Sequence, residues 1–347
     1  MFDPSTASRQ SGTPLREEYR DFMKKRYIFL IIIFLIAAVL IFLGRDTASP
    51  DREINWGVTF EKDFAKKLGL DWQEAYLSIL DDLKIKKIRI AARWSDVELS
   101  QNNFNFTDLD WQLKEAAIRD ARVILAVGYK LPRWPECHEP TWVKDRRSAV
   151  LAYIEKTVMR YKDNPAIFAW QIENEPFLPF GECPLFDVNL LDEEIALVKK
   201  MDNRPIVITD SGELGLWVRA ASRADIFGTT MYRWVWNEYL GSYKYPLPPS
   251  FFRIKERLTR LFAGQQKPFI VIELQGEPWA HKQIYETPIE EQMKLMSLGE
   301  FNSTIDYAKQ TGFSDYYLWG VEWWYYLKQN GHPEYWDDVK NLIETSK

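Results

Sequence analysis

Two glutamates follow apolar, strand-like runs and are candidates for acid/base chemistry. Glu175 comes shortly after the run at 166–172, and Glu273 directly follows the run at 269–272. Hydrolysis of a glycosidic bond with retention needs two carboxyl groups about 5 to 5.5 Å apart, one to protonate the leaving oxygen and one to attack the anomeric carbon. A barrel of parallel strands brings residues at strand ends side by side. We therefore expect these two glutamates to share one face of the fold.

The elements that must position them alternate between strand-like and helix-like patterns. Strands are expected at 54–59, 87–92, 122–128, 166–172, 205–209, 225–230, 268–272 and 316–319. Helical patterns lie between most of them, at 72–83, 109–119, 148–161, 193–201 and 289–309, and a last helix is expected at 334–344. Eight strand–helix units predict an α/β fold, the (β/α)8 TIM barrel. The alternative, an open doubly wound sheet, is disfavoured because no Gly-x-Gly-x-x-Gly follows the first strand.

An uncharged apolar run at 27–44 precedes the barrel. As a helix its 18 residues would rise about 27 Å, close to the thickness of the hydrocarbon layer, which predicts a transmembrane anchor. Lys24, Lys25 and Arg26 stand directly before it, so the positive-inside bias predicts a cytoplasmic N-terminus and an extracytoplasmic catalytic domain. The alternative is a cleaved signal peptide, although its apolar region is usually shorter, about 7 to 15 residues.

The segments around the anchor complete the expected domain organisation. Residues 1–26 are expected to form a short cytoplasmic tail. The polar segment 45–53 is typical of a linker, and the barrel is expected to occupy 54–347.

Composition narrows the function further. A net charge of −5 argues against a nucleic-acid partner. The three histidines show no paired spacing, so we expect neither a metal site nor a cofactor. The 15 tryptophans suit both a protein core and the faces of sugars. Cys137 and Cys183 are expected to form a disulfide in an exported domain, and two free buried thiols are the alternative.

The fourth strand ends in a motif with two candidate acids. Side chains alternate along a strand, so Glu173 and Glu175 would share a direction if the extended geometry persisted, and spacing alone does not choose between them. Asn174-Glu175-Pro176 resembles the Asn-Glu-Pro that carries the acid/base in clan A retaining glycoside hydrolases, a group that holds cellulases, β-mannanases and β-galactosidases. The resemblance implies that Glu175 is the acid/base and that Asn174 donates a hydrogen bond to the sugar 2-hydroxyl.

The same resemblance implies roles at other strand ends. Glu273 would be the nucleophile, with Glu277 its nearest competitor. Arg89 on the second strand would contact the nucleophile and keep it ionised, and a structural ion pair elsewhere is the alternative. Tyr232 after the sixth strand would hydrogen-bond the nucleophile, and Trp319 after the eighth would form the floor under the sugar being cleaved.

One position departs from the typical cellulase pattern, and several aromatic residues add weaker candidates. Thr230 stands where several of these enzymes have a histidine. Trp323 and Trp324 would either extend the sugar platform or pack in the core. The weaker candidates for lining the groove are Trp134, Trp234, Trp236 and Trp279.

These patterns predict a membrane-tethered retaining glycoside hydrolase. It would cleave O-glycosidic, β-linked bonds of an extracytoplasmic oligo- or polysaccharide by double displacement, and it would contact the lipid bilayer through residues 27–44. Two alternatives remain open: a noncatalytic carbohydrate-binding barrel, and a transglycosylase that uses the same pair of carboxylates.

Overall fold

The computed structural model describes residues 14–45, 52–264 and 266–346. The chain divides into two compact units, Met1–Arg45 and Asp46–Lys347. Part of the expected cytoplasmic tail (1–13) and most of the expected linker (46–51) lie outside the described residues.

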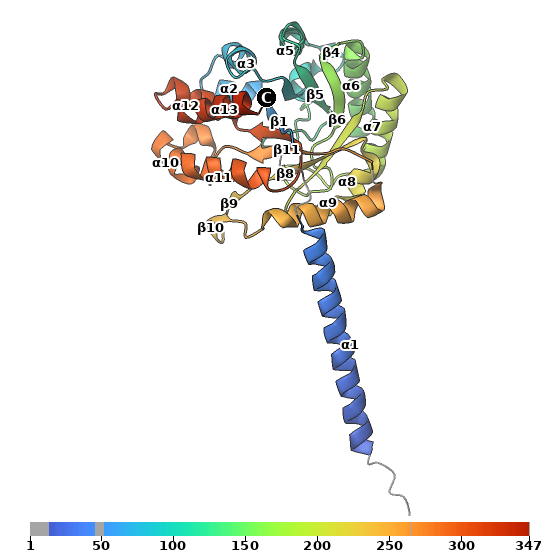
Figure 1. Cartoon of the computed structure of the whole chain (residues 1–347). Coiled ribbons are helices and arrows are strands. Elements are labelled where there is room, and N and C mark those ends of the chain that lie inside the picture. Colours follow the sequence, from blue (N-terminus) through green and yellow to red (C-terminus); the bar gives the residue numbers. More distant parts are fainter. Residues whose placement is uncertain (1–13, 46–51, 265, 347) are drawn as a thin grey trace, which may run out of the picture. The chain divides into compact units, whose positions relative to one another are not determined.

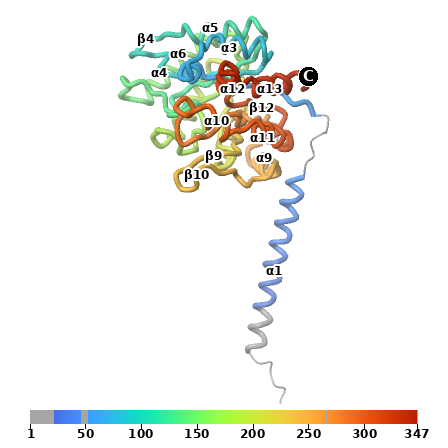
Figure 2. The backbone as a smooth tube through the Cα atoms, turned by 90° about the vertical axis from the view of Figure 1, so that its left-hand side faces the viewer, coloured from blue at the N-terminus to red at the C-terminus, as the bar shows by residue number. Residues whose placement is uncertain are grey.

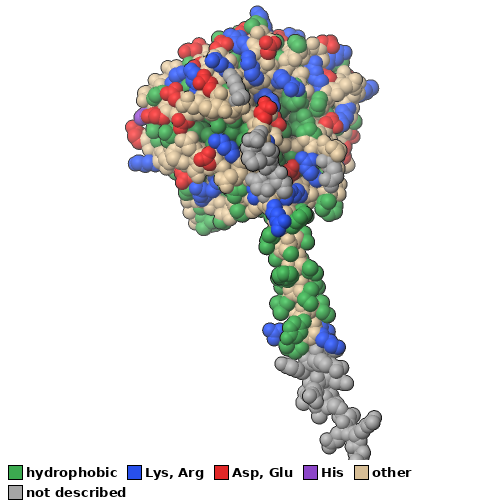
Figure 3. Space-filling model, in the orientation of Figure 1, with side chains coloured by type: hydrophobic (Ala, Val, Ile, Leu, Met, Phe, Trp, Pro, Cys, Tyr) green, Lys and Arg blue, Asp and Glu red, His purple; other side chains and the backbone are tan. Residues whose placement is uncertain are grey.

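The first unit contains the helix α1 (Pro14–Leu43). Its segment Phe22–Leu43 is long and apolar enough to cross a membrane, and its side chains are largely exposed. A signal sequence near an N-terminus has the same properties. Figure 3 shows hydrophobic side chains along this helix, with lysine and arginine side chains toward its N-terminal end. The helix begins before the apolar run predicted at 27–44, because Lys and Arg at 24–26 are good helix formers.

The second unit is built on a closed barrel of eight parallel strands (Figure 1). They are β1 (Asn55–Thr59), β2 (Lys87–Ala91), β5 (Arg122–Val127), β6 (Ile167–Ile172), β7 (Ile206–Asp210), β8 (Ile226–Met231), β11 (Phe269–Gln275) and β12 (Asp315–Trp319). The ring closes where β1 pairs with β12 in parallel register. The predicted (β/α)8 barrel is therefore confirmed.

Helices follow the strands and surround them. They are α2 (Lys62–Lys67), α3 (Trp72–Asp81), α4 (Trp94–Val97), α5 (Thr107–Ile118), α6 (Arg146–Tyr161), α7 (Val188–Met201), α8 (Val218–Arg223), α9 (Pro249–Ala263), α10 (Ile289–Leu295), α11 (Leu298–Lys309), α12 (Val321–Gln329) and α13 (Glu334–Thr345), with a 3-10 turn η1 (Ile284–Glu286). The single helix predicted at 289–309 was wrong. It is divided between α10 and α11, because the hydroxyl of Ser297 accepts a hydrogen bond from the Glu300 amide at 3.2 Å and starts a new helix.

Two small antiparallel hairpins lie outside the eight-stranded ring. The first consists of β3 (Glu98–Ser100) and β4 (Asn103–Phe104), and the second of β9 (Trp234–Asn237) and β10 (Gly241–Lys244). In the second hairpin, the Asn237 side chain accepts hydrogen bonds from the amides of Tyr239 and Leu240, which fixes the turn. Along the chain this hairpin lies between β8 and α9, and Figure 2 shows it close to α9.

Alternate side chains of the strands divide the core into two layers. A cluster inside the barrel contains Ile124, Ala169, Val207, Ile226, Ile270, Ile272 and Tyr317. Their neighbours along the strands, such as Val123 and Leu125, belong to the larger cluster that also contains the apolar faces of the helices. The end of the chain returns to the first strand, since Trp56 Nε1 donates to Ser346 Oγ at 3.0 Å.

Candidate active site

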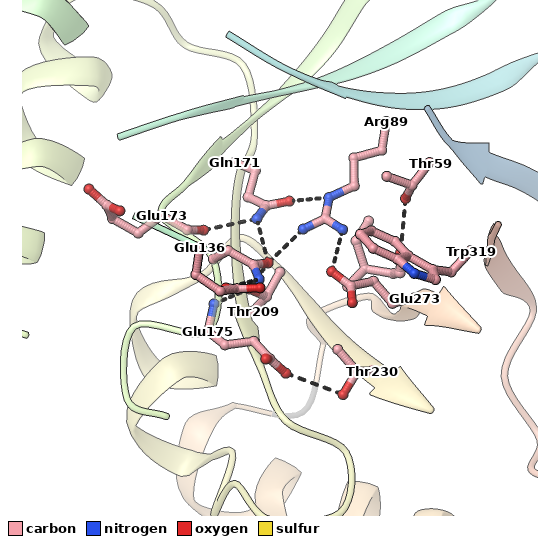
Figure 4. Close-up of polar contacts among 12 residues, drawn as sticks. Thr59, Arg89, Glu136, Gln171, Glu173, Glu175, Thr209, Thr230, Glu273 and Trp319 are labelled. Atoms are coloured by element: carbon pink, nitrogen blue, oxygen red, sulfur yellow. Dashed lines mark hydrogen bonds and ion pairs between the residues drawn. The ribbon is translucent and has the colours of Figure 1, made fainter. Parts of the chain in front are cut away.

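Arg89 is the centre of a buried hydrogen-bond network at the carboxyl ends of the strands (Figure 4). It lies on β2 between two isoleucines and is fully buried. Its Nη1 contacts Glu273 Oε1 at 2.6 Å, its Nε donates to Gln171 Oε1 at 2.8 Å and its Nη2 donates to Asn174 Oδ1 at 2.7 Å. A buried guanidinium is costly unless it is paired, and here it connects the ends of β2, β6 and β11.

Both oxygens of Glu273 are held by donors. Arg89 contacts Oε1, and the hydroxyl of Tyr232 donates to Oε2 at 2.9 Å. The register between β11 and β8 shifts between Val271 and Glu273, a local irregularity of the kind that re-aims a side chain. Glu273 is 5% exposed, so a small part of this residue faces solvent.

The structure separates the two glutamates of the Asn-Glu-Pro motif. Strand β6 ends at Ile172, and both Glu173 and Glu175 have positive φ, so the extended geometry does not persist. The Glu173 carboxylate accepts hydrogen bonds from the backbone amides of Tyr129 at 3.0 Å and Lys130 at 2.6 Å. Figure 4 shows it pointing away from the Arg89 network, whereas the Glu175 carboxylate turns toward Thr230.

Glu175 and Glu273 line the same cavity, of about 210 Å³. A second cavity, of about 190 Å³, is lined by Glu273 and Trp319. The two cavities share Glu136, Phe180, Tyr232, Glu273 and Trp279. They therefore adjoin at Glu273 and offer space on two sides of this carboxylate.

Burial and mutual repulsion raise the pKa of two carboxyl groups in this site. Burial raises the pKa of Glu175 well above its ordinary value, and the charges of Glu273 and Glu136 raise it further. Burial raises the pKa of Glu136 to about 7, and the charge of Glu273 acts in the same direction, against the attraction of Lys130. Burial and the neighbouring charges therefore favour the protonated form of Glu175, which can donate a proton.

Trp319 and Glu277 form a second group of contacts beside Glu273. Trp319 Nε1 donates to Glu277 Oε1 at 2.8 Å, and the Arg133 guanidinium pairs with the same carboxylate. Arg133 also lies over the Trp319 ring, 4.4 Å from its centroid. Both oxygens of Glu277 are engaged by these donors, and Glu277 lines the cavity of Trp319 but not that of Glu175.

The remaining tryptophans fall into two groups. Trp323 and Trp324 are fully buried, and their indole nitrogens donate to Gln292 Oε1 and to the Gly276 carbonyl, so they pack in the core. Among the weaker candidates, Trp134 and Trp279 line the cavity of Trp319, Trp236 and Trp279 line that of Glu175, and Trp234 lines neither.

The structure joins Cys137 and Cys183 in a disulfide, with their Cα atoms 5.4 Å apart. It links the loops that follow β5 and β6. Within the described parts of the chain, no group of three or more His, Cys, Asp or Glu residues is arranged to hold a metal ion.

Sequence reasoning missed several residues of the network. Gln171 carries a detectable signal, because it is the one amide in the apolar run 166–172. Thr209 Oγ1 accepts a hydrogen bond from the Glu175 amide at 2.8 Å. Glu136, whose Oε2 accepts a hydrogen bond from Asn174 Nδ2 at 3.1 Å, lies on an irregular loop where no periodic pattern could have indicated it.

Comparisons with known proteins agree with this architecture. No protein-family model matches the chain. A stretch of 73 residues, 21% of the chain, is 36% identical to the probable mannan endo-1,4-β-mannosidase A-1 of Aspergillus terreus. The match covers 19% of that protein, so the chain spans about a fifth of the length of the curated relatives it matches.

Solved structures cover far more of the chain. The β-galactosidase of Rahnella sp. R3 aligns with 86% of this chain and 56% of its own, with a TM-score of 0.57 and 13% identity. A GH5_18 protein of Bifidobacterium longum subsp. longum aligns with 77% of this chain and 69% of its own, with a TM-score of 0.56 and 13% identity. The chain has the fold of the clan A glycoside hydrolases. In this barrel, Glu175 follows the fourth strand and Glu273 lies on the seventh.

Proposed function

We propose that this clan A barrel is a retaining β-glycosidase that cleaves O-glycosidic bonds of an oligo- or polysaccharide. Glu273 is the nucleophile and Glu175 the acid/base. One observation supports this proposal above all. Glu175 and Glu273 face one cavity from the ends of two strands, and Glu273 is fixed by Arg89 and Tyr232.

The reaction proceeds in two displacements. In the first, Glu175 gives its proton to the leaving oxygen while Glu273 attacks the anomeric carbon, so the bond to the leaving group breaks and a glycosyl ester forms. In the second, the Glu175 carboxylate takes a proton from water, which attacks the anomeric carbon and releases Glu273.

The electrostatics of the site fit this exchange of roles. The negative charge of Glu273 raises the pKa of Glu175 in the resting site. Formation of the ester removes that charge, so the pKa of Glu175 falls and its carboxylate becomes available as a base. Asn174 would hydrogen-bond the sugar 2-hydroxyl, and Trp319 would form the floor under the sugar being cleaved.

The comparison suggests the first substrate to test. The relative in Aspergillus terreus is named a mannan endo-1,4-β-mannosidase, so β-1,4-mannan comes first. Space on both sides of Glu273 suits a sugar on each side of the cleaved bond. We further propose that residues 27–44 anchor the protein in a membrane, with the N-terminus cytoplasmic and the barrel outside.

The experiment is hydrolysis of 4-nitrophenyl β-glycosides and β-1,4-mannan by the wild-type chain and three variants. Glu273→Ala should abolish turnover. Glu175→Ala should slow poor leaving groups far more than activated aryl ones, with partial rescue by azide. Glu155→Gln, on the exposed face of α6, is the matched control and should retain activity.

Labelling identifies the nucleophile directly. A 2-fluoro glycoside should label Glu273 in a peptide analysed by mass spectrometry, and a label on Glu277 would overturn the assignment. Sugar binding without any turnover would favour the noncatalytic barrel. Oligosaccharides longer than the substrate would show that a sugar hydroxyl, rather than water, resolves the intermediate.

A further inference from the structure

Glu136 is a third carboxylate in the site, and the reaction above does not use it. It lies on the loop after β5, is 6% exposed and lines both cavities. Its Oε2 accepts the hydrogen bond from Asn174 Nδ2, and among the described residues no hydrogen bond reaches its Oε1. This unpaired oxygen is not buried, so it faces the open cavity rather than packed protein.

The loop holds Glu136 firmly in this position. The Glu136 amide donates to the Arg133 carbonyl at 2.8 Å, and the Leu131 amide donates to the Glu136 carbonyl at 2.8 Å. The next residue, Cys137, is linked to Cys183. Glu136 has φ of 73°, a conformation that is strained for a non-glycine residue and persists where the surroundings enforce it.

A purely structural role does not explain the carboxylate. The nearby cations are committed to other partners, since Lys130 Nζ donates to the carbonyls of Glu175 and Leu178, and Arg89 contacts Glu273. Burial of an acidic group is costly, and a neutral glutamine would orient Asn174 equally well. Glu136 therefore keeps an acidic group beside an open cavity, where a donor on a ligand can pair with its free oxygen.

We propose that Glu136 binds the sugar that Asn174 holds, and that its free oxygen accepts a hydrogen bond from a hydroxyl or ammonium group at C2. The inference rests on the proposed function, because Asn174 places the 2-substituent beside Glu136. Glu136 is then a specificity residue. It favours glycosides with a donor at C2, and together with Glu273 it disfavours negatively charged sugars.

The test pairs two variants with two substrates. The substrates are the 4-nitrophenyl β-glycoside that wild type hydrolyses best and its 2-deoxy counterpart. Glu136→Ala should lower kcat/KM about 10- to 100-fold on the 2-hydroxy substrate, the effect of losing a hydrogen bond to a charged group. It should lower kcat/KM less than about threefold on the 2-deoxy substrate. An equal loss on both substrates would show that Glu136 only supports the fold and would overturn the inference.

A second variant separates the two donor chemistries. Glu136→Gln keeps an acceptor oxygen but removes the charge. If the ligand group is a hydroxyl, Glu136→Gln should retain most of the activity that Glu136→Ala loses. If it is an ammonium, wild type should prefer the 4-nitrophenyl 2-amino-2-deoxy glycoside, and Glu136→Gln should lose this preference.

A binding measurement keeps this inference separate from the proposed function. Titration calorimetry of the full chain carrying Glu175→Gln, with the methyl β-glycoside and its 2-deoxy counterpart, needs no turnover. Weaker binding of the 2-hydroxy sugar alone after Glu136→Ala supports the inference even if wild type hydrolyses nothing. Absence of binding, or equal weakening of both sugars, overturns it.

Discussion

Thr230 illustrates how one hydroxyl links two parts of the site. It donates to Glu175 Oε1 at 3.2 Å and accepts a hydrogen bond from the Gly212 amide at 3.0 Å. It stands two positions before Tyr232, so the same strand end contacts both the acid/base and the nucleophile of the proposed reaction.

We predict that Thr230→Val lowers kcat/KM about tenfold, because it removes the hydrogen bond to the Glu175 carboxyl group and leaves the buried Gly212 amide without an acceptor. Steady-state kinetics on aryl β-glycosides measure the loss. Thr230→Ser keeps the hydroxyl and should stay close to wild type. A serine variant as impaired as the valine variant would show that the methyl group, rather than the hydrogen bond, matters.

At the scale of single residues, sequence reasoning reached the side chains that lie on strands. Arg89 and Glu273 interrupt or end apolar runs, so their polarity stands out, and Glu175 belongs to a recognisable motif. Contacts that depend on irregular backbone were not predictable. The positive φ of Glu136 and Glu175 decides where these carboxylates point, and no periodicity encodes it.

Between elements, the packing of α7 against β6 buries a pair of acids. Glu194 on α7 is fully buried, and within the described part of the chain neither of its carboxylate oxygens has a hydrogen-bond partner. Burial raises the pKa of Glu194 well above its ordinary value, and the charge of Glu173 raises it further. Burial likewise raises the pKa of Glu173, to about 8. The folded state therefore keeps protons on these two carboxyl groups, whereas the unfolded state, in which their pKa is near 4.5, releases them.

This pair makes the barrel less stable as pH rises. A carboxyl group whose pKa is raised by folding contributes its full stability at pH below its unfolded-state pKa. The contribution is lost as pH rises through its folded-state pKa. Glu194→Gln replaces one of the two acids with a group of similar size that does not titrate. We predict that it raises the free energy of unfolding by about 1 to 3 kcal/mol at pH 8 and has a smaller effect at pH 5.

Thermal unfolding of wild type and Glu194→Gln at both pH values measures this difference. Glu193→Gln changes the adjacent, exposed position of α7 and is the matched control. If wild type and Glu194→Gln lose stability in parallel between pH 5 and pH 8, then another group governs the dependence.

The elements themselves were predicted best where burial is continuous. All eight barrel strands coincide with predicted runs, because a parallel strand covered on both faces appears as a mostly apolar segment. Residues 289–309 were predicted as a single helix because their apolar spacing continues past the N-terminal cap at Ser297. The β9–β10 hairpin went unrecognised because its aromatic residues face cavity and rim rather than a regular core.

At the scale of the whole molecule, the proposed membrane anchor in α1 can be tested directly. An anchored protein should stay in the membrane fraction after washing at high salt or alkaline pH, and its intact mass should include residues 27–44. Exogenous protease added to intact cells should reach the barrel but not the tail. Release of a shortened chain into the medium would instead identify the apolar segment as a cleaved signal.

The hydrogen bond between Trp56 and Ser346 brings the two ends of the barrel unit together. Neighbouring ends allow a chain to be reconnected and reopened elsewhere without altering its interior. A circular permutant that joins the C-terminal helix to the first strand through a short glycine-rich bridge should therefore retain the ring of eight strands. In such a protein the new ends could be placed in a surface loop far from the groove, and a tether or tag could be moved there.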